Sequence, residues 1–217
     1  MAGLGLDLVS KSDQSTGNYA HASYALQSGD IRMIFTAPYK SKSSSNENAA
    51  LPNFEAEKAV DFFLKHGLGV RAIAIEVENV KESYNIIQNE GGEGVLAPIK
   101  VEDKLGGNGY IEIAEVKLYG DVVLRMLNLQ NFKGSTLPNF QDLQCSSHDS
   151  NGLLGKGKFG LARIDHVVGN LYDLKATLNS IKKMTGFHEF AEFVSEDVGT
   201  VDSGLNRLLY HEYDSFF

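Results

Sequence analysis

The sequence LARIDHVVGN at residues 161–170 decides how the rest of the chain is understood. Apolar residues recur in it and a Gly-Asn pair follows them, which is typical of a buried strand that ends in a turn: Leu161, Ile164, Val167, Val168, Gly169 and Asn170. His166 stands at the centre of this predicted strand. The strand therefore opens a structural module with one imidazole, which is either a hydrogen-bonded core residue or part of a site.

A second copy of the pattern occurs earlier in the chain, as RAIAIEVENV at residues 71–80. Aligning it with residues 163–172 places strand on strand and turn on turn, and both copies run on into a predicted helix. Ala74 then takes the place of His166, so one copy offers an imidazole where the other offers a methyl group. The later copy is the one equipped for chemistry.

Composition narrows the class of protein. A chain of 217 residues with 42% hydrophobic and 22% charged residues can bury a core in one large or two small domains. The net charge of -8 and the lack of a basic run make nucleic acid an unexpected partner.

The single cysteine, Cys145, cannot form an internal disulfide, which fits a reducing compartment. No apolar stretch is long enough for a membrane span and no signal peptide is evident, so we expect a cytoplasmic protein, unless a longer precursor carries a plastid address.

The first third of the chain predicts a hairpin followed by a helix. The expected elements are the end of a helix at residues 1–8, strands at 15–26 and 31–36, a solvated loop at 41–48, and a helix at 54–66 that Gly67 ends.

The next third predicts one complete βαβββ module. Its elements are a strand at 70–77, a helix at 80–89 that Gly91 and Gly92 stop, and strands at 94–100, 110–117 and 121–129.

Residues 131–160 are rich in glycine and polar residues and predict a linker. The Gly155-Lys156-Gly157 sequence matches neither the P-loop nor the dinucleotide fingerprint, so we assign it no phosphate role.

Several motifs together resemble the plant 4-hydroxyphenylpyruvate dioxygenases, which are members of the vicinal-oxygen-chelate superfamily. The similar stretches are KSDQSTGN (11–18), HAS (21–23), FTAPY (35–39), HGLGVRA (66–72), AEVKLYGDVVLR (114–125), DHVVGN (165–170), TGFHEFAEF (185–193), DVGT (197–200) and SGLN (203–206). The resemblance implies an α+β fold of repeated βαβββ modules, with the first and third modules incomplete. It implies three parts: an N-terminal vicinal-oxygen-chelate domain at 1–130, whose second module is 70–130, the linker at 131–160, and the start of a truncated catalytic domain at 161–217.

The resemblance also implies a reaction. This family uses Fe(II) to convert 4-hydroxyphenylpyruvate and O₂ to homogentisate and CO₂ in tyrosine catabolism. Two imidazoles and a carboxylate hold one face of such an iron and leave positions for a 2-oxo acid and O₂. By resemblance, His166 is the first histidine ligand, and Val168 and Asn206 contact the substrate. Val168 lies two positions from His166 and shares its face if the segment is a strand.

The resemblance breaks at both ends. The family begins with a strand and helix ahead of residue 3, and after Asn206 the match ends, with Arg207 where the family has a small serine. The second histidine and the glutamate of the iron site have no counterpart here. One imidazole cannot hold Fe(II) in a defined geometry, so we expect a fragment that is inactive alone. We also expect residues 161–217 to be poorly packed, since the sheet would have an open edge.

The remaining polar candidates are read as structural. They are His21, His188, Glu189 and Glu192. Asp165, which strand alternation places on the face opposite His166, is expected to support a ligand or the fold and not to be a ligand itself. Two alternatives stay open beside the dioxygenase fragment. One is a non-enzymatic binding module that retains the N-terminal half of the family as a stable, metal-free oligomer, such as a homodimer. The other is a small glyoxalase-type metalloenzyme with ligands shared between chains.

Overall fold

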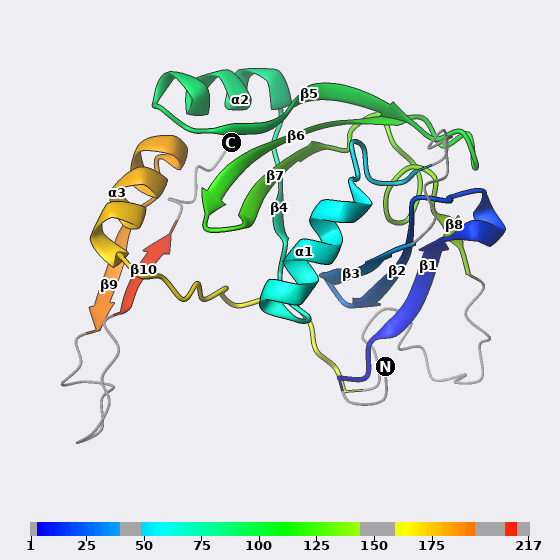
Figure 1. Cartoon of the computed structure of the whole chain (residues 1–217), viewed down its shortest axis with the longest axis horizontal. Helices are drawn as coiled ribbons and strands as arrows, with labels where there is room; N and C mark the ends of the chain where they lie inside the picture. The colour runs from blue at the N-terminus through cyan, green and yellow to red at the C-terminus, as the bar shows by residue number, and fades with distance from the viewer. Residues whose placement is uncertain (1–3, 40–48, 144–158, 194–206, 212–217) are drawn as a thin grey trace.

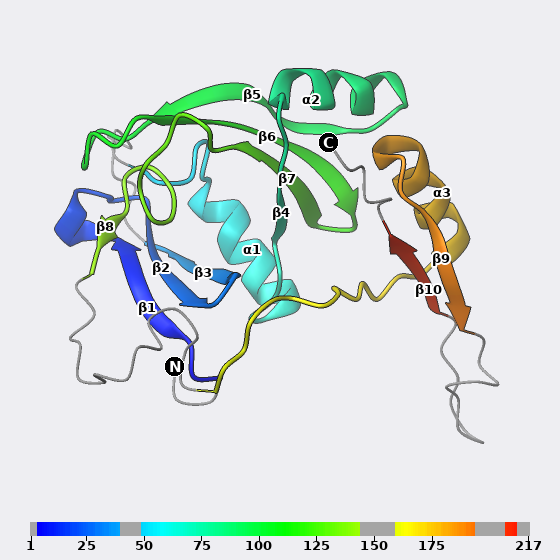
Figure 2. The ribbon, with the colours of Figure 1, turned by 180° about the vertical axis from the view of Figure 1, so that it is seen from behind.

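Figure 1 shows the computed structural model, which describes residues 4–39, 49–143, 159–193 and 207–211. Two four-stranded sheets face each other, and a helical segment with a two-stranded sheet lies to one side (Figures 1 and 2). The first sheet, sheet A, has the antiparallel order β3-β2-β1-β8. Its strands are β1 (Asp7–Ser12), β2 (His21–Ser28), β3 (Ile31–Pro38) and β8 (Gln141–Asp142).

The second sheet, sheet B, has the order β4-β7-β6-β5 and forms the complete βαβββ module that the sequence predicts. Its elements are β4 (Ala72–Glu76), α2 (Val80–Asn89), β5 (Gly94–Glu102), β6 (Tyr110–Tyr119) and β7 (Val122–Asn128). β4 pairs with β7 in parallel, whereas the other neighbours are antiparallel. Asn79 caps α2 by accepting a hydrogen bond of 3.0 Å from the backbone N–H of Glu82, which explains why the helix begins there.

Two expectations for the N-terminal part are wrong. Residues 7–12 form β1 and not the end of a helix. The strand expected at 15–26 begins only at His21, because Asp13 caps a short 3₁₀ helix, η1 (Gln14–Thr16), that turns the chain. In contrast, the hairpin partner β3 and the helix α1 (Ala56–His66), which ends at Gly67, confirm the prediction. The predicted loop at 41–48 lies outside the described residues.

Two apolar clusters form the core, one on each face of sheet B. Ile111 and Ile113 of β6 point toward sheet A and pack with Ala25 of β2, with Phe140 and with Leu96 of the neighbouring strand β5. The intervening positions of β6 point the other way, so Ala114 and Val116 pack beneath Val80 and Ile87 of α2. β6 is therefore buried on both faces along its central part.

Residues 131–143, the first part of the predicted linker, pack against both sheets. Leu137 and Phe140 belong to the core between the sheets, and β8 extends sheet A. Asp103 fixes this segment, because its buried carboxylate accepts hydrogen bonds from the backbone N–H groups of Asn139 (3.0 Å) and Asn108 (3.1 Å). The second part, 144–158, lies outside the described residues.

The prediction of a strand at residues 161–170 is wrong. The structure shows an extended segment there, without a strand partner among the described residues. Its apolar side chains are exposed to solvent, with Val167 at 53% and Val168 at 58%. The physical reason is pairing, since a strand forms only where another supplies hydrogen-bond partners. Its equivalent β4 pairs with β7 alone. The counterpart of β7, 92 residues further along by the offset between Ala74 and His166, would begin at about residue 214, outside the described residues.

The remainder of the second copy forms as its pattern predicts. The helix α3 (Leu174–Thr185) follows the extended segment and is capped by Asp173, whose side chain accepts from the backbone N–H of Ala176 at 2.9 Å. β9 (His188–Phe193) pairs with β10 (Arg207–His211). α3 packs against α2 through Met184, which is buried in the cluster beneath α2. The helix therefore joins the second copy to the first.

Candidate functional site

His166 lies in the extended segment between β8 and α3 and is half-exposed. Its Nδ1 atom is 2.7 Å from the Oδ2 atom of Asp165. The expectation that strand alternation sends these two side chains to opposite faces is therefore wrong, and it fails because the segment is not a pleated strand. An imidazole that donates its Nδ1–H to a carboxylate keeps Nε2 as its acceptor, which is the arrangement that metal-bound histidines commonly have.

The other two predicted site residues add no ligand to His166. Val168 is 58% exposed, so its side chain is directed largely at solvent. Asn206 lies outside the described residues. Within the described ranges, no three side chains of His, Cys, Asp or Glu come close enough to hold a metal ion. One imidazole and its neighbouring carboxylate do not fit the two-imidazole, one-carboxylate set of the implied iron centre, and we derive no chemical step through iron.

His21 is the centre of a second polar cluster, on the inner face of sheet A. It is fully buried, and its Nδ1 lies 2.9 Å from Ser23 Oγ, which in turn lies 2.7 Å from Thr36 Oγ1. The backbone N–H of Leu51 points at Nε2 from 3.4 Å. Burial lowers the pKa of His21 to about 4, so the imidazole is neutral at pH 7. The structural interpretation of His21 is confirmed, since the cluster holds β2 to the loop before α1 and contains no open position.

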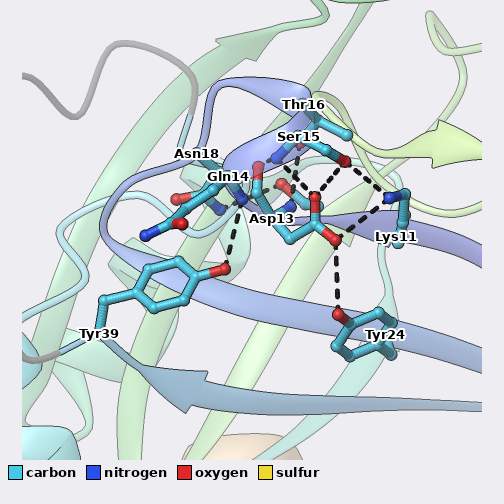
Figure 3. Close-up of polar contacts among 9 residues, drawn as sticks. Lys11, Asp13, Gln14, Ser15, Thr16, Asn18, Tyr24 and Tyr39 are labelled. Carbon is cyan, nitrogen blue, oxygen red and sulfur yellow. Dashed lines mark hydrogen bonds and ion pairs between the residues drawn. The ribbon is translucent and has the colours of Figure 1, made fainter.

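Asp13 organises a third polar cluster on the outer side of sheet A (Figure 3). Its carboxylate accepts a hydrogen bond of 2.9 Å from the backbone N–H of Ser15 and lies 3.3 Å from Lys11 Nζ. The hydroxyl of Tyr24 donates to it from 3.4 Å. Burial raises the pKa of Asp13, but the hydrogen bonds from Ser15 and Lys11 outweigh burial and bring the pKa below its ordinary value. A carboxylate held ionised in this way caps a turn and is a poor general base.

The residues that contact the His166 segment were not found from the sequence. The Ser28-Gly29-Asp30 turn was predicted only as a hairpin turn, and Tyr119 with Gly120 only as the connection between the strands at 110–117 and 121–129. The structure places both against the segment, on either side of His166. No sequence signal could have revealed this, because Ser28 and Leu161 are 133 positions apart.

The fold defines the class of protein. The βαβββ module of sheet B, set against a second four-stranded sheet, is a vicinal-oxygen-chelate fold. A triple mutant of 4-hydroxymandelate synthase from Streptomyces coelicolor has a similar structure, with a TM-score of 0.63 and 15% identity. The similarity covers 88% of this chain and 48% of that one.

Sequence comparison then identifies the relatives. The chain is a homologue of plant 4-hydroxyphenylpyruvate dioxygenases: it is 43% identical to the carrot protein (Daucus carota) over 208 residues and 43% identical to the Arabidopsis thaliana protein over 220. These matches cover 95% and 98% of this chain, but 45% and 47% of the relatives. The 4-hydroxyphenylpyruvate dioxygenase of the fungus Pyricularia oryzae is 27% identical over 210 residues. The chain thus spans about half the length of the curated relatives it matches. No family model matches it.

Proposed function

We propose that this polypeptide serves the 4-hydroxyphenylpyruvate dioxygenase reaction, in which Fe(II), O₂ and 4-hydroxyphenylpyruvate yield homogentisate and CO₂. The observation that carries the proposal is the 43% identity to plant enzymes of that name across 95% of the chain. The DHVVGN sequence around His166 lies within this homologous length. The substrate and O₂ would be its partners. We place the protein in the cytoplasm; no helix of the described residues is long and apolar enough to cross a membrane.

The chain's contribution to the iron centre is one imidazole. His166 would bind the metal through Nε2, while Asp165, 2.7 Å from Nδ1, holds the ring and its tautomer. Val168 and Asn206 would line the substrate pocket. Because the described residues provide no second imidazole and no further carboxylate near His166, the other ligands must come from other residues or another polypeptide. We therefore expect the 217-residue chain alone to be inactive.

An anaerobic Fe(II) titration of the purified chain tests the proposal, followed by O₂ and 4-hydroxyphenylpyruvate with detection of homogentisate. Alone, the chain should bind no stoichiometric iron and form no product. Mixed with the C-terminal half of the carrot enzyme, it should gain both. His166→Ala should abolish that gain, whereas His66→Ala, which removes another half-exposed histidine, should not. Full iron binding and activity in the His166→Ala mixture would refute the assignment of His166.

One observation favours a non-enzymatic module as the second candidate. The core between sheets A and B closes without any side chain from the part of 161–217 whose side chains the structure describes, so the N-terminal part can be stable by itself. Such a module would be a metal-free oligomer of unchanged mass with or without Fe(II). Sedimentation equilibrium of the whole chain distinguishes the candidates, because a stable dimer that also ignores the C-terminal half of the carrot enzyme would favour the module.

A further inference from the structure

The segment that carries His166 crosses the ends of both sheets. It leaves the neighbourhood of sheet A, runs past the end of α1 and continues to α3 (yellow in Figures 1 and 2). Although it is not a strand, it is not loose, because two turns of the N-terminal sheets hold it. The β2–β3 turn contacts it before His166, and the end of β6 contacts it after His166.

The first contact is made by backbone and hydroxyl groups of the β2–β3 turn. Ser28 Oγ donates a hydrogen bond of 2.6 Å to the carbonyl of Leu161, and the backbone N–H of Asp30 donates one of 2.7 Å to the carbonyl of Ala162. Gly29 lies between these donors with φ +55°, and a Cβ atom there would lie 2.5 Å from the Ala162 carbonyl oxygen. Only glycine permits both the backbone conformation and the close approach.

The second contact is a packing contact on the other side of His166. The ring of Tyr119 lies against Gly169, where a Cβ atom would come within 2.8 Å of the ring carbon Cζ. Burial raises the pKa of Tyr119, which agrees with a phenol that is partly covered by protein. Tyr119 ends β6, so the ring is carried by a strand that has a neighbour on each side in sheet B.

We propose that these two contacts form a clamp by which the N-terminal sheets position the His166 imidazole. Ser28, Gly29, Asp30 and Tyr119 are then positioning residues of the site, although none touches the imidazole. The purpose of the clamp, to position an iron ligand, rests on the proposed function. The two contacts that form the clamp are present in this chain whatever its activity. Fixing both Ala162 and Gly169 restricts the intervening seven peptide steps, which could otherwise reach about 25 Å, to one course.

Gly29→Ala provides the test and Gly107→Ala its matched control. Both glycines lie in hairpin turns with positive φ, +55° and +65°, but a Cβ at Gly107 meets nothing within 4 Å. The backbone strain of the two substitutions is thus alike, and only Gly29→Ala pushes against Ala162. Trypsin should cleave after Arg163 about tenfold faster in Gly29→Ala than in wild type or Gly107→Ala, because the loss of one or two hydrogen bonds frees the segment. Exchange of the Asp30 amide should accelerate alongside it.

A spectroscopic measurement separates positioning from stability. The ¹H–¹⁵N imidazole signals of His166, assigned by their loss in His166→Gln, should shift and broaden in Gly29→Ala, while those of buried His21 stay in place. Ser28→Ala removes a single hydrogen bond and is the second variant should Gly29→Ala not fold. Tyr119→Ala should give the same shift as Gly29→Ala, and Tyr119→Phe, which keeps the ring on Gly169, should restore the wild-type signal.

Each outcome bears on the clamp independently of iron. Unchanged cleavage at Arg163 and unchanged His166 signals in Gly29→Ala and Ser28→Ala would overturn the clamp, whatever the activity of the mixture with the carrot half-enzyme. A clamp with the expected behaviour in a chain that never gains iron would instead refute the proposed function and leave the clamp standing.

Discussion

The two aligned copies, residues 71–80 and 163–172, have the same pattern and fold differently. In the first copy, residues 72–76 form β4, pair with β7 and lie partly beneath α2. In the second copy, the equivalent residues run extended, with Ile164 51% and Val167 53% exposed. Both copies then continue into a capped helix, α2 or α3. The helix follows from local signals alone, whereas the strand also needs a partner.

The largest effect expected from this difference concerns the two isoleucines Ile113 and Ile164. Ile113 is 1% exposed in the core between the sheets, so Ile113→Ala should lower the free energy of unfolding by about 4 kcal/mol. Ile164 is 51% exposed, and Ile164→Ala should change it by no more than about 0.5 kcal/mol. Urea denaturation followed by circular dichroism measures both. Equal losses would mean that the second copy is packed in solution as tightly as the first.

Acid should destabilise the N-terminal sheets through buried His21. The pKa of buried His21 is about 4 in the folded protein, below the ordinary 6.5, so the unfolded chain binds the proton more readily. The free energy of unfolding should therefore fall as the pH drops from about 6.5 to 4, by about 3 kcal/mol in total. The fall arises because the imidazole can take up a proton freely only after unfolding. In the folded protein the ring is buried against Ser23 and the backbone N–H of Leu51, which do not solvate a charged imidazole.

Denaturation curves collected between pH 7 and pH 4 check this. His21→Gln should flatten the pH dependence, because no group with a lowered histidine pKa remains at that place. A steep slope in His21→Gln would show that the acid sensitivity arises elsewhere, and Asp13 and Asp103 are not responsible in this range, since their lowered pKa values act only below about pH 4.

The helix caps compare the copies at equivalent positions. Asn79→Ala removes the cap of α2, which packs on sheet B, and should cost about 1 kcal/mol of global stability. Asp173→Ala removes the corresponding cap of α3. Because α3 joins the core mainly through Met184, its loss should speed amide exchange within α3 by about fivefold and leave the global transition unchanged. A shift of the global midpoint in Asp173→Ala would show that both copies unfold as one unit.

The sequence predicts the first copy, with its module in sheet B, better than the second copy. The helix that begins after Asn79, its end at Gly91 and Gly92, and the four strands of sheet B were predictable because their signals are local and their paired residues lie no more than 51 positions apart. The 3₁₀ turn at Asp13 was missed, although Asp13 and Thr16 form a capping box that could have indicated it. Segment 161–170 was misjudged, because its apolar pattern does not say whether a partner strand is present.

The candidate site was predictable only in its residue types. His166 was predicted from the resemblance of its sequence motif and stays a prediction, and its contact with Asp165 depends on the segment leaving the pleated conformation. The contacts of Gly29 with Ala162 and of Tyr119 with Gly169 join distant parts of the chain, and no local pattern specifies them. They follow from how the two sheets place their turns, which is a property of the packed fold and not of any one stretch.

The smallest effect is expected at Asp121, in the turn after Tyr119. Its Oδ2 accepts hydrogen bonds from Lys65 Nζ at 2.6 Å and His66 Nε2 at 2.8 Å, and these lower the pKa of Asp121 to about 2. The ordinary value is 3.8, so this contribution is present above about pH 4 and is lost as the pH falls toward 2. The groups are exposed, so Asp121→Asn should lower Tm by no more than about 2 °C, and salt at about 1 M should remove the difference.

Glu93→Gln is the matched control, since it breaks a single exposed ion pair with Lys117 in the same sheet. Thermal denaturation at low and high salt compares the variants, and trypsin cleavage after Arg163 shows whether the turn matters to the His166 segment. Asp121 ties α1 to the turn that carries Tyr119, but the Tyr119 ring itself is fixed by β6. Cleavage should therefore remain at the wild-type rate in Asp121→Asn. Cleavage as fast as in Gly29→Ala would mean that surface charge, and not packing on Gly169, holds that end of the clamp.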